Sequence, residues 1–183
     1  MTYPVHTIDT APDAAKEMLA ESRKAYGFVP NLHAVMAEAP ALLKAYRRVG
    51  DFFDETSFTP AERQVVLLTV SYENGCEYCV AAHSAIAGMQ KVPGDVVQAI
   101  RNGQVIADQK LEALRRYTAA VVVSRGRPSD ADAQAFLNAG YSRAQTLEVV
   151  LGVGMKTLSN YTNHLADTPL DEAFANARWH KEG

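Results

Sequence analysis

Hydrophobic residues recur at helical spacing along most of the chain, and short turn sequences separate one repeat from the next. Positions three and four apart share a face of an α-helix, so this periodicity predicts amphipathic helices. The predicted helices cover residues 11–26, a short stretch from residue 30, and residues 40–53, 60–70, 76–89, 95–101, 108–124, 129–139 and 142–165. The strand-turn-strand alternation of a β-hairpin is not found in the sequence. The pattern therefore predicts an all-α helical bundle.

The segment 57–70 combines a helix start with a hydrophobic run that also suits a buried strand. Thr59, Pro60 and Glu62 stand where an N-cap and the first and third helical positions are expected, which is the pattern of a capping box. The run 65–70 that follows is rich in β-branched residues and apolar nearly all round, so a buried strand is the alternative. The cap favours a buried helix, and capping is the alternative to a catalytic role for Glu62.

The last predicted helix, 142–165, contains two glycines and ends in a polar cluster. Gly152 and Gly154 would each weaken an isolated helix by about 1 kcal/mol, so we expect them to permit close approach of another helix. The polar cluster 160–164 includes His164, which is a candidate for the active site or for an interface. The alternative is a histidine of the last helical turn that is favoured by the helix dipole.

The two ends of the chain differ in character from the helices between them. Residues 1–10 are predicted to form an extended arm, and residues 169–183 a C-terminal tail. Phe174 and Trp179 in the tail are too hydrophobic to remain in solvent, so we predict that they pack on the body of the protein or on a neighbouring subunit. We therefore expect a single domain over residues 1–183, with an arm and a tail.

The composition is that of an ordinary soluble globular protein, with 48% hydrophobic and 21% charged residues among 183. A net charge of −3 argues against non-specific nucleic-acid binding, which needs a basic surface. No apolar run approaches the ~20 residues of a membrane span. The first residues lack the basic flank and apolar core of a signal peptide, so a cytoplasmic location is expected.

The only two cysteines, Cys76 and Cys79, are spaced Cys-x-x-Cys, and His83 follows four residues after the second. The dipeptide Asn74-Gly75 favours a turn, so it should end the preceding helix and allow another to begin. Positions i, i+3 and i+7 of a helix share a face, so both sulfurs and the imidazole should lie on one stripe. The sulfurs are then close enough to form a disulfide, and His83 is close enough to exchange a proton with Cys79.

This spacing suits two-electron thiol chemistry. A free thiol has a pKa of about 8.5, and both a helix N-terminus and a neighbouring histidine lower it. A second thiol one turn away converts a sulfenic acid to a reversible disulfide before over-oxidation occurs. In a reducing compartment, a Cys-x-x-Cys pair is more often catalytic or metal-bound than structural. The motif therefore favours peroxide reduction or disulfide exchange.

Two other interpretations of the same residues remain open. Cys76, Cys79 and His83 supply three of the four ligands that structural zinc requires, and the fourth would have to be a distant residue such as His164. Alternatively, the cysteines are buried and inert, since free cysteine is among the most buried residue types.

The segment 63–71, followed by 74–83 with its two cysteines and His83, resembles the core motif of the alkylhydroperoxidase D (AhpD) family, which belongs to the carboxymuconolactone decarboxylase superfamily. The resemblance covers about residues 58–90. It implies an AhpD-like helical fold, a trimer or hexamer, and thiol peroxidase or disulfide reductase activity without metal or cofactor. It also implies a hydroperoxide substrate and a dithiol reductant, either a lipoyl group or a thioredoxin-like protein. Cys79 would attack the peroxide, Cys76 would form the disulfide, and His83 would belong to a proton relay.

The sequence departs from the family pattern at two positions. Gln64 stands where the family often has a glutamate, and glutamine cannot act as a base. The proton relay would then be shorter, or it would use Glu62 or Glu73. Tyr78 stands between the cysteines, where the best-known members have a histidine. Together with His164, these residues complete the set of candidates for the relay.

Two other functions compete with a thiol peroxidase. One is a lyase of the carboxymuconolactone decarboxylase type, which needs a proton donor and an anion-binding pocket but no thiol pair. The other is a non-enzymatic redox sensor, in which the disulfide changes partner binding. The paired cysteines favour the oxidoreductase over the lyase.

Overall fold

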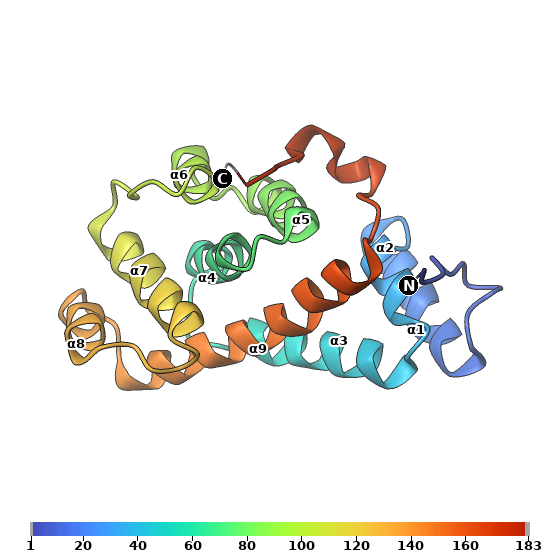
Figure 1. Ribbon diagram of the computed structural model, residues 1–183, viewed down its shortest axis with the longest axis horizontal. Coiled ribbons are helices and arrows are strands. Elements are labelled where there is room, and N and C mark those ends of the chain that lie inside the picture. Colours follow the sequence, from blue (N-terminus) through green and yellow to red (C-terminus); the bar gives the residue numbers. More distant parts are fainter. Residues whose placement is uncertain (1, 182–183) are drawn as a thin grey trace.

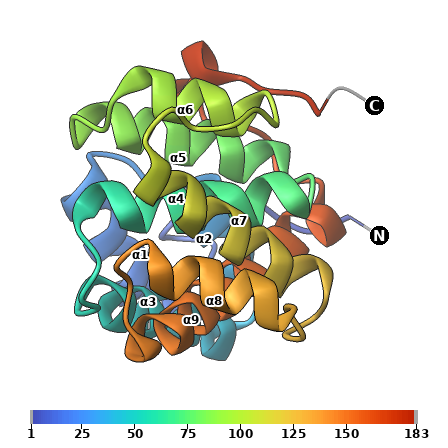
Figure 2. The ribbon, with the colours of Figure 1, turned by 90° about the vertical axis from the view of Figure 1, so that its left-hand side faces the viewer.

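Helix α4 (Pro60–Glu73) runs through the centre of the molecule, and the other helices surround it (Figure 1, Figure 2). It contacts α5 (Glu77–Met89), α6 (Gly94–Arg101), α7 (Gln109–Val123) and α9 (Arg143–Ala166). Every residue of α4 from 64 to 71 is buried. A helix that is apolar all round is buried on all sides, which explains the lack of a polar face here. The predicted buried helix is confirmed, and the alternative of a strand is wrong.

The remaining elements complete an all-α fold. The structure is a computed structural model that describes residues 2–181, and within this range it contains no β-strand. The predicted fold class is confirmed. Met1 and the last two residues of the predicted tail lie outside the described residues. The other elements are α1 (Asp13–Tyr26), α2 (Asn31–Met36), α3 (Pro40–Asp54), α8 (Asp130–Asn138) and the short 3₁₀ helix η1 (Glu172–Ala177).

The start of α4 is fixed by the capping box that the sequence predicts. The Glu62 backbone N–H donates to Thr59 Oγ1 at 3.2 Å, and the Thr59 N–H donates to Glu62 Oε2 at 2.8 Å. These two bonds satisfy backbone donors that would otherwise lack partners at a helix N-terminus. Glu62 also forms an ion pair with Lys110 at 3.2 Å.

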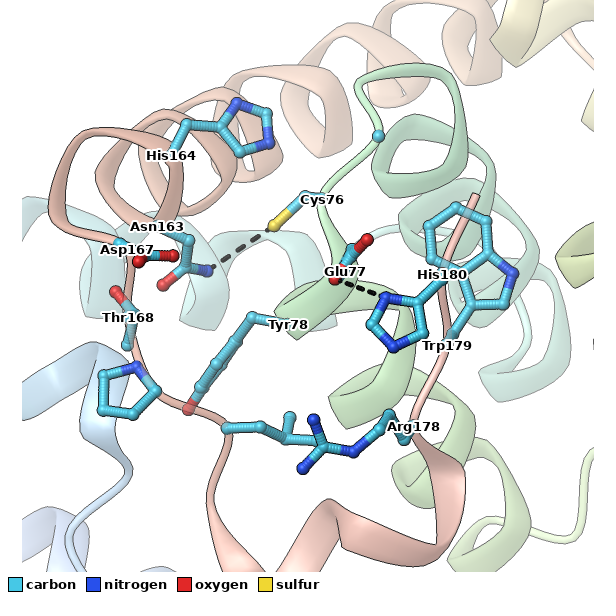
Figure 3. A pocket seen from close by; sticks show the side chains of 13 residues that line it. Cys76, Glu77, Tyr78, Asn163, His164, Asp167, Thr168, Arg178, Trp179 and His180 are labelled. Carbon is cyan, nitrogen blue, oxygen red and sulfur yellow. Dashed lines mark hydrogen bonds and ion pairs between the residues drawn. The ribbon is translucent and has the colours of Figure 1, made fainter. Parts of the chain in front are cut away.

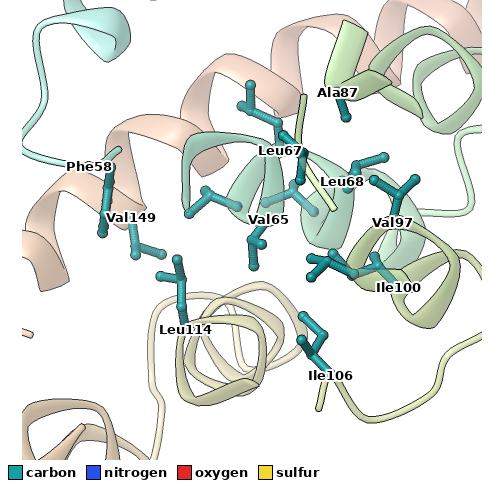
Figure 4. Packing of buried hydrophobic residues seen from close by; sticks show 14 of the residues in the cluster. Phe58, Val65, Leu67, Leu68, Ala87, Val97, Ile100, Ile106, Leu114 and Val149 are labelled. Carbon is teal, nitrogen blue, oxygen red and sulfur yellow. The ribbon is translucent and has the colours of Figure 1, made fainter. Parts of the chain in front are cut away.

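Two hydrophobic clusters lie on either side of the central helix. The first joins α4 to α6 and α7 and includes Val65, Ile100 and Leu114 (Figure 4). The second joins α1, α2 and α3 to the start of α5, and it contains both Cys76 and Cys79. The cysteines therefore lie in a hydrophobic environment, where a negatively charged sulfur needs compensating donors or charges.

Helix α9 crosses the body of the protein, and its buried face is largely polar (Figure 1). Two of its hydrophobic side chains, Leu147 and Val150, are instead 71% and 52% exposed. The buried residues of the helix are Val149, Gly152, Lys156, Ser159, Asn160 and Asn163. Buried polar groups need partners, so this face must meet other polar groups inside the protein.

One of the two glycines of α9 allows the close approach that the sequence predicts. A Cβ atom at Gly152 would lie 2.7 Å from Val66 Cγ1 of α4 and 2.8 Å from Phe53 Cε2 of α3. Gly154 is exposed, and a Cβ atom there would meet nothing within 4 Å. The expectation of helix packing is therefore confirmed for Gly152 and wrong for Gly154, because Gly154 lies on the solvent-exposed face of the helix.

These two glycines give a matched pair for testing the packing of α9. We expect Gly154→Ala to stabilise the protein by up to about 1 kcal/mol through helix propensity alone. Gly152→Ala gains the same propensity but overpacks the core, which typically costs about 1–3 kcal/mol, so we expect it to be the less stable variant of the two. Chemical unfolding followed by circular dichroism measures both. Equal changes in the two variants would contradict the close packing at Gly152.

The C-terminal segment covers the start of α5 and the end of α4. Trp179 is 7% exposed, and its indole N–H donates to the Arg101 carbonyl at 2.8 Å. Phe174 is 9% exposed and packs edge to face on Tyr78. Lys181 Nζ donates to the Tyr72 carbonyl at 3.0 Å. The prediction that Phe174 and Trp179 pack on the body of the protein is confirmed.

Candidate active site

The two cysteines stand at the junction of α4 and α5, where the turn is set by one glycine. Gly75 has a φ of +66°, a left-handed conformation that favours glycine. The Cys76 N–H donates to the Ser71 carbonyl at 2.9 Å and so closes the turn. Cys76 is the N-cap of α5, and its side chain caps no backbone N–H. Cys79 follows in the first turn, where the positive end of the helix dipole favours a thiolate.

Both sulfurs contact the same side chain of α9. Asn163 Nδ2 lies 3.2 Å from Cys79 Sγ and 3.6 Å from Cys76 Sγ. The hydroxyl of Ser159 lies 3.7 Å from Cys79 Sγ. Both cysteines are reduced and 1% exposed. A single amide thus holds the two thiols together, and it donates hydrogen bonds to both.

His83 contacts two residues from different helices, and neither of them is a cysteine. Its Nδ1 lies 3.0 Å from Gln64 Oε1 of α4, and its Nε2 lies 3.0 Å from Lys156 Nζ of α9. An ammonium can only donate, so Nε2 is the accepting nitrogen and Nδ1–H donates to Gln64. Burial, together with the charge of Lys156, holds the pKa of His83 well below its usual value. His83 is therefore neutral near pH 7.

The predicted direct contact between His83 and Cys79 is replaced by a contact with Lys156. Within residues 2–181, no hydrogen bond joins the imidazole to either sulfur. The reason is geometric, because Gln64 and Lys156 occupy both ring nitrogens. Gln64 itself stands beside His83, and its Nε2 donates to Gln90 Oε1 at 3.1 Å. It fixes the tautomer of the imidazole, and it cannot accept a proton.

Lys156 is the residue of this site that the sequence analysis missed. It is 1% exposed, and among the ion pairs of residues 2–181 none joins it to a carboxylate. A lysine is almost never fully buried without a partner. Its charge acts on the neighbouring Cys79 thiol, which can become negative. Lys156 is therefore placed as the positive charge of the site.

The surroundings of the two thiols lower the pKa of one and raise the pKa of the other. Burial alone would raise the pKa of Cys79, but hydrogen bonding with Cys76, the charge of Lys156 and the hydroxyl of Ser159 outweigh it and lower that pKa well below its usual value. The pKa of Cys76 is raised by its hydrogen bond to Cys79 and by burial. The thiolate therefore resides on Cys79, and the proton stays on Cys76.

The other candidates for a proton relay lie away from the sulfurs. Glu62 is held by its cap and by Lys110. Glu73 is at the end of α4, where its carbonyl faces Lys181, and no hydrogen bond within the described range joins it to a cysteine. The Tyr78 hydroxyl donates to Asp171 Oδ2 at 2.5 Å, so it faces the C-terminal segment. The side chains of Glu62 and Tyr78 are thus occupied by structural contacts, whereas His164 lies at the edge of a pocket.

A pocket of about 600 Å³ opens beside Cys76, between the end of α9, the start of α5 and the C-terminal segment (Figure 3). Asn163 and His164 line it from α9, and His180 lines it from the C-terminal segment. The Cys76 sulfur points toward Asn163 at the wall of this space (Figure 3). Cys79 is not among the lining residues. Cys76 is thus the cysteine at the pocket wall, although its side chain is as deeply buried as that of Cys79.

The buried polar residues of α9 follow a helical spacing in the sequence, and the structure shows what that spacing means. Lys156, Ser159, Asn160 and Asn163 recur at i, i+3, i+4 and i+7, so they share one face of the helix. Gly152 continues that face one turn earlier. A polar face that includes a small residue in close contact with another helix indicates a buried polar site. Considered as separate residues along a helix with many hydrophobic positions, they carry no such signal.

Two further observations bear on ligands and on membranes. Within residues 2–181, no group of three or more His, Cys, Asp or Glu side chains is arranged to hold a metal ion. The zinc ligands considered from the sequence do not come together, because both nitrogens of His83 are engaged elsewhere. None of the helices in the described range combines the length and the apolar character needed to cross a membrane.

Comparison with known proteins finds a family whose sequence pattern matches part of the chain and solved structures that share its fold. The sequence pattern of the Carboxymuconolactone decarboxylase family matches residues 37–120, a segment that includes Gln64, both cysteines and His83. No curated protein is similar enough in sequence to match the chain.

Solved structures share the fold over nearly the whole length. An AhpD-core, uncharacterized peroxidase-related protein from Ralstonia eutropha JMP134 is 24% identical, with a TM-score of 0.83, and 98% of this chain and 97% of that chain are covered. A peroxidase-related protein from Silicibacter sp. TM1040 is 16% identical, with a TM-score of 0.80 and coverage of 95% and 92%. A cysteine-to-alanine variant of the debrominase Bmp8, in complex with 2,3,4-tribromopyrrole, is 18% identical, with a TM-score of 0.80 and coverage of 97% and 95%. At these identities the likeness concerns the fold.

Proposed function

We propose that the chain is an AhpD-like member of the carboxymuconolactone decarboxylase superfamily, and that it is a dithiol oxidoreductase that reduces hydroperoxides through Cys79 and Cys76. The observation that carries this proposal is the set of groups around Cys79. Asn163 donates to its sulfur at 3.2 Å, and the buried ammonium of Lys156 supplies a positive charge. A thiolate, and not a thiol, is the nucleophile in such chemistry.

The reaction has two steps that these residues support. The Cys79 thiolate attacks the terminal oxygen of the hydroperoxide, a sulfur–oxygen bond forms, the oxygen–oxygen bond breaks, and the alcohol leaves after taking up a proton. The Cys76 thiol then condenses with the Cys79 sulfenic acid, releasing water and forming the disulfide. Asn163 holds the two sulfurs side by side for this second step. The net result is oxidation of two thiols and reduction of one peroxide.

Lys156 and His83 serve the first step together. The ammonium of Lys156 stabilises the thiolate before attack and the negative charge on the departing oxygen afterwards. His83 accepts a hydrogen bond from Lys156 through Nε2 and so orients the ammonium. Gln64 in turn holds the imidazole in the tautomer that leaves Nε2 free to accept. His83 is thus a positioning residue in this proposal, and Lys156 carries the charge.

The proposal is tested by following the mass of the intact protein during exposure to a hydroperoxide. We expect the reduced protein to lose two hydrogen atoms when one equivalent of cumene hydroperoxide is added, and to regain them with dihydrolipoamide. Peptide mapping should place the new bond between Cys76 and Cys79. Addition of oxygen atoms without loss of hydrogen, or no change at all, would contradict a dithiol peroxidase.

Reductive dehalogenation is a second candidate function, favoured by the likeness to the debrominase. The same two thiols can supply two electrons to a carbon–bromine bond, with the disulfide, bromide and a proton as the other products. Bromide release from 2,3,4-tribromopyrrole by the reduced protein distinguishes this function from peroxide reduction.

A lyase would retain its activity after replacement of both cysteines. A redox sensor would show slow turnover together with an oxidation-dependent change in assembly.

A further inference from the structure

We infer that the C-terminal segment, residues 168–181, is a lid that must open before a molecule from solvent reaches the thiol pair, and that the hydrogen bond between Tyr78 and Asp171 is its latch. The lid rests on the proposed function only in requiring that the thiols react with molecules from solvent. Three features support it: the burial of both sulfurs, the position of the segment over them, and the residues to which the segment is fastened.

In the closed structure, neither thiol is open to solvent. Cys76 and Cys79 are each 1% exposed, and the pocket of about 600 Å³ ends at the wall that contains Cys76. Asn163 and Ser159 of α9 contact the Cys79 sulfur. A thiolate must come within bonding distance of the atom that it attacks, so part of this enclosure has to move.

The C-terminal segment is the part of the enclosure that can move most easily. Helix α4 is buried along residues 64–71, and α9 is packed on both α3 and α4. The C-terminal segment contains only the short helix η1, which packs mainly on α5 at the periphery of the molecule (Figure 1). Segments with few regular backbone hydrogen bonds open at a lower free energy than core helices do. The segment can therefore open while the helices stay folded.

The segment covers the hydrophobic cluster that holds the thiols. Phe174 belongs to the same cluster of buried residues as both cysteines, and Leu170 packs against it. The ring of Phe174 lies edge to face on Tyr78, with 6.3 Å between the ring centroids. Leu170 and Trp179 also line the pocket beside Cys76. Opening of the segment would thus remove one wall of the pocket and uncover the cluster.

The segment is fastened to the two residues that stand between the cysteines. The Tyr78 hydroxyl donates to Asp171 Oδ2 at 2.5 Å, and His180 Nδ1 pairs with Glu77 Oε2 at 2.9 Å (Figure 3). The Asp171 carboxylate, which is 6% exposed, also accepts from the Asn31 N–H at 3.0 Å. Hydrogen bonds to a buried carboxylate are strong, whereas an exposed ion pair contributes little. The latch is therefore the bond of Tyr78, a residue that departs from the family pattern.

The first test asks whether the thiols become accessible without global unfolding. The reduced wild-type protein is treated with N-ethylmaleimide at urea concentrations below its unfolding transition, and labelling is followed by intact mass. The free energy of opening, obtained from the labelling rate, should fall with urea at no more than about a third of the slope for global unfolding, because a local opening exposes little surface. Equal slopes would overturn the inference. Peroxide is absent, so failure of the peroxidase proposal does not affect the result.

The second test weakens the latch. Asp171→Ala removes the partner of the Tyr78 hydroxyl and of the Asn31 N–H. We expect labelling without urea to become about tenfold faster, because a hydrogen bond to a charged group is among the stronger ones. Glu172→Ala, at an exposed residue of the same segment, is the matched control and should leave the rate unchanged. Equal labelling rates in the two variants would contradict the latch.

A milder variant and hydrogen exchange locate the opening. Trp179→Phe keeps an aromatic ring but removes the N–H that donates to the Arg101 carbonyl at 2.8 Å, so labelling should become about threefold to fivefold faster. In Asp171→Ala, mass spectrometry should find faster amide exchange in peptides from residues 168–181 and unchanged exchange in α4. Faster labelling with unchanged exchange in residues 168–181 would place the opening elsewhere and overturn the inference.

Discussion

Replacement of Cys79 by serine is expected to abolish peroxide reduction, lowering the rate by at least about a thousandfold because a serine hydroxyl is far harder to ionise than a thiol. The surroundings of the residue tolerate the change. Asn163 and Ser159 remain as hydrogen-bond partners, and an oxygen is smaller than a sulfur, so the fold should be kept. Turnover is measured by loss of cumene hydroperoxide with dihydrolipoamide as reductant.

Cys76→Ser is the informative companion of this variant. It retains the attacking thiolate but lacks the thiol that closes the disulfide, so one equivalent of peroxide should be consumed and then turnover should stop. The intact mass should show the gain of one oxygen atom at Cys79, trapped as sulfenic acid. If Cys79→Ser consumed peroxide and Cys76→Ser did not, the two roles would be exchanged.

Replacement of Lys156 by methionine is expected to have the next largest effect. Methionine fills a similar volume without the charge, so the pKa of the Cys79 thiol should rise toward its ordinary value of about 8.5. In the wild-type protein that pKa is lowered, so the thiolate persists as the pH falls below 8.5 and is lost only at the lower folded-state pKa. At neutral pH we expect peroxide consumption to slow by about tenfold to a hundredfold. The ultraviolet absorbance of the thiolate, followed against pH, measures the pKa directly.

Two further variants separate charge from packing at this position. Lys156→Arg retains a positive charge and should keep much of the shift in the pKa of Cys79, although its longer planar head will not sit as well against His83. Lys44→Met removes an exposed lysine of α3 and should change neither the pKa nor the rate. An unchanged titration of Cys79 in Lys156→Met would show that the charge of Lys156 is not what ionises the thiol.

Much of the fold is predictable because local signals agree with one another. Thr59, Ser129 and Ser142 each cap the helix that the hydrophobic period predicts, and all three capping boxes are present in the structure. The turn before Cys76 follows from Asn74 and Gly75. Caps and turns depend on neighbours within a few residues, so they can be predicted from the local sequence alone.

The site is predictable only in the part that lies within one segment. The spacing of Cys76, Cys79 and His83 indicates thiol chemistry, and these residues do come from one helix and its cap. Lys156 and Asn163 come from a helix more than seventy positions along the chain, as the contact of Lys156 with His83 shows. Which face of α9 turns inward is decided by packing on α3 and α4, and the exposed Leu147 shows that hydrophobicity alone does not decide it. The identity of the group beside Cys79 therefore required the tertiary structure.

The absence of an ion pair between Lys156 and any carboxylate within residues 2–181 has a consequence for redox equilibrium. When the disulfide closes, the anion beside this ammonium disappears, and a buried charge is left among neutral groups. The dithiol form is thus favoured over the bridged form, as in proteins that are strong thiol oxidants. The bond between Cys76 and Cys79 should accordingly have a high reduction potential, and electrons from a modest donor should flow into it spontaneously.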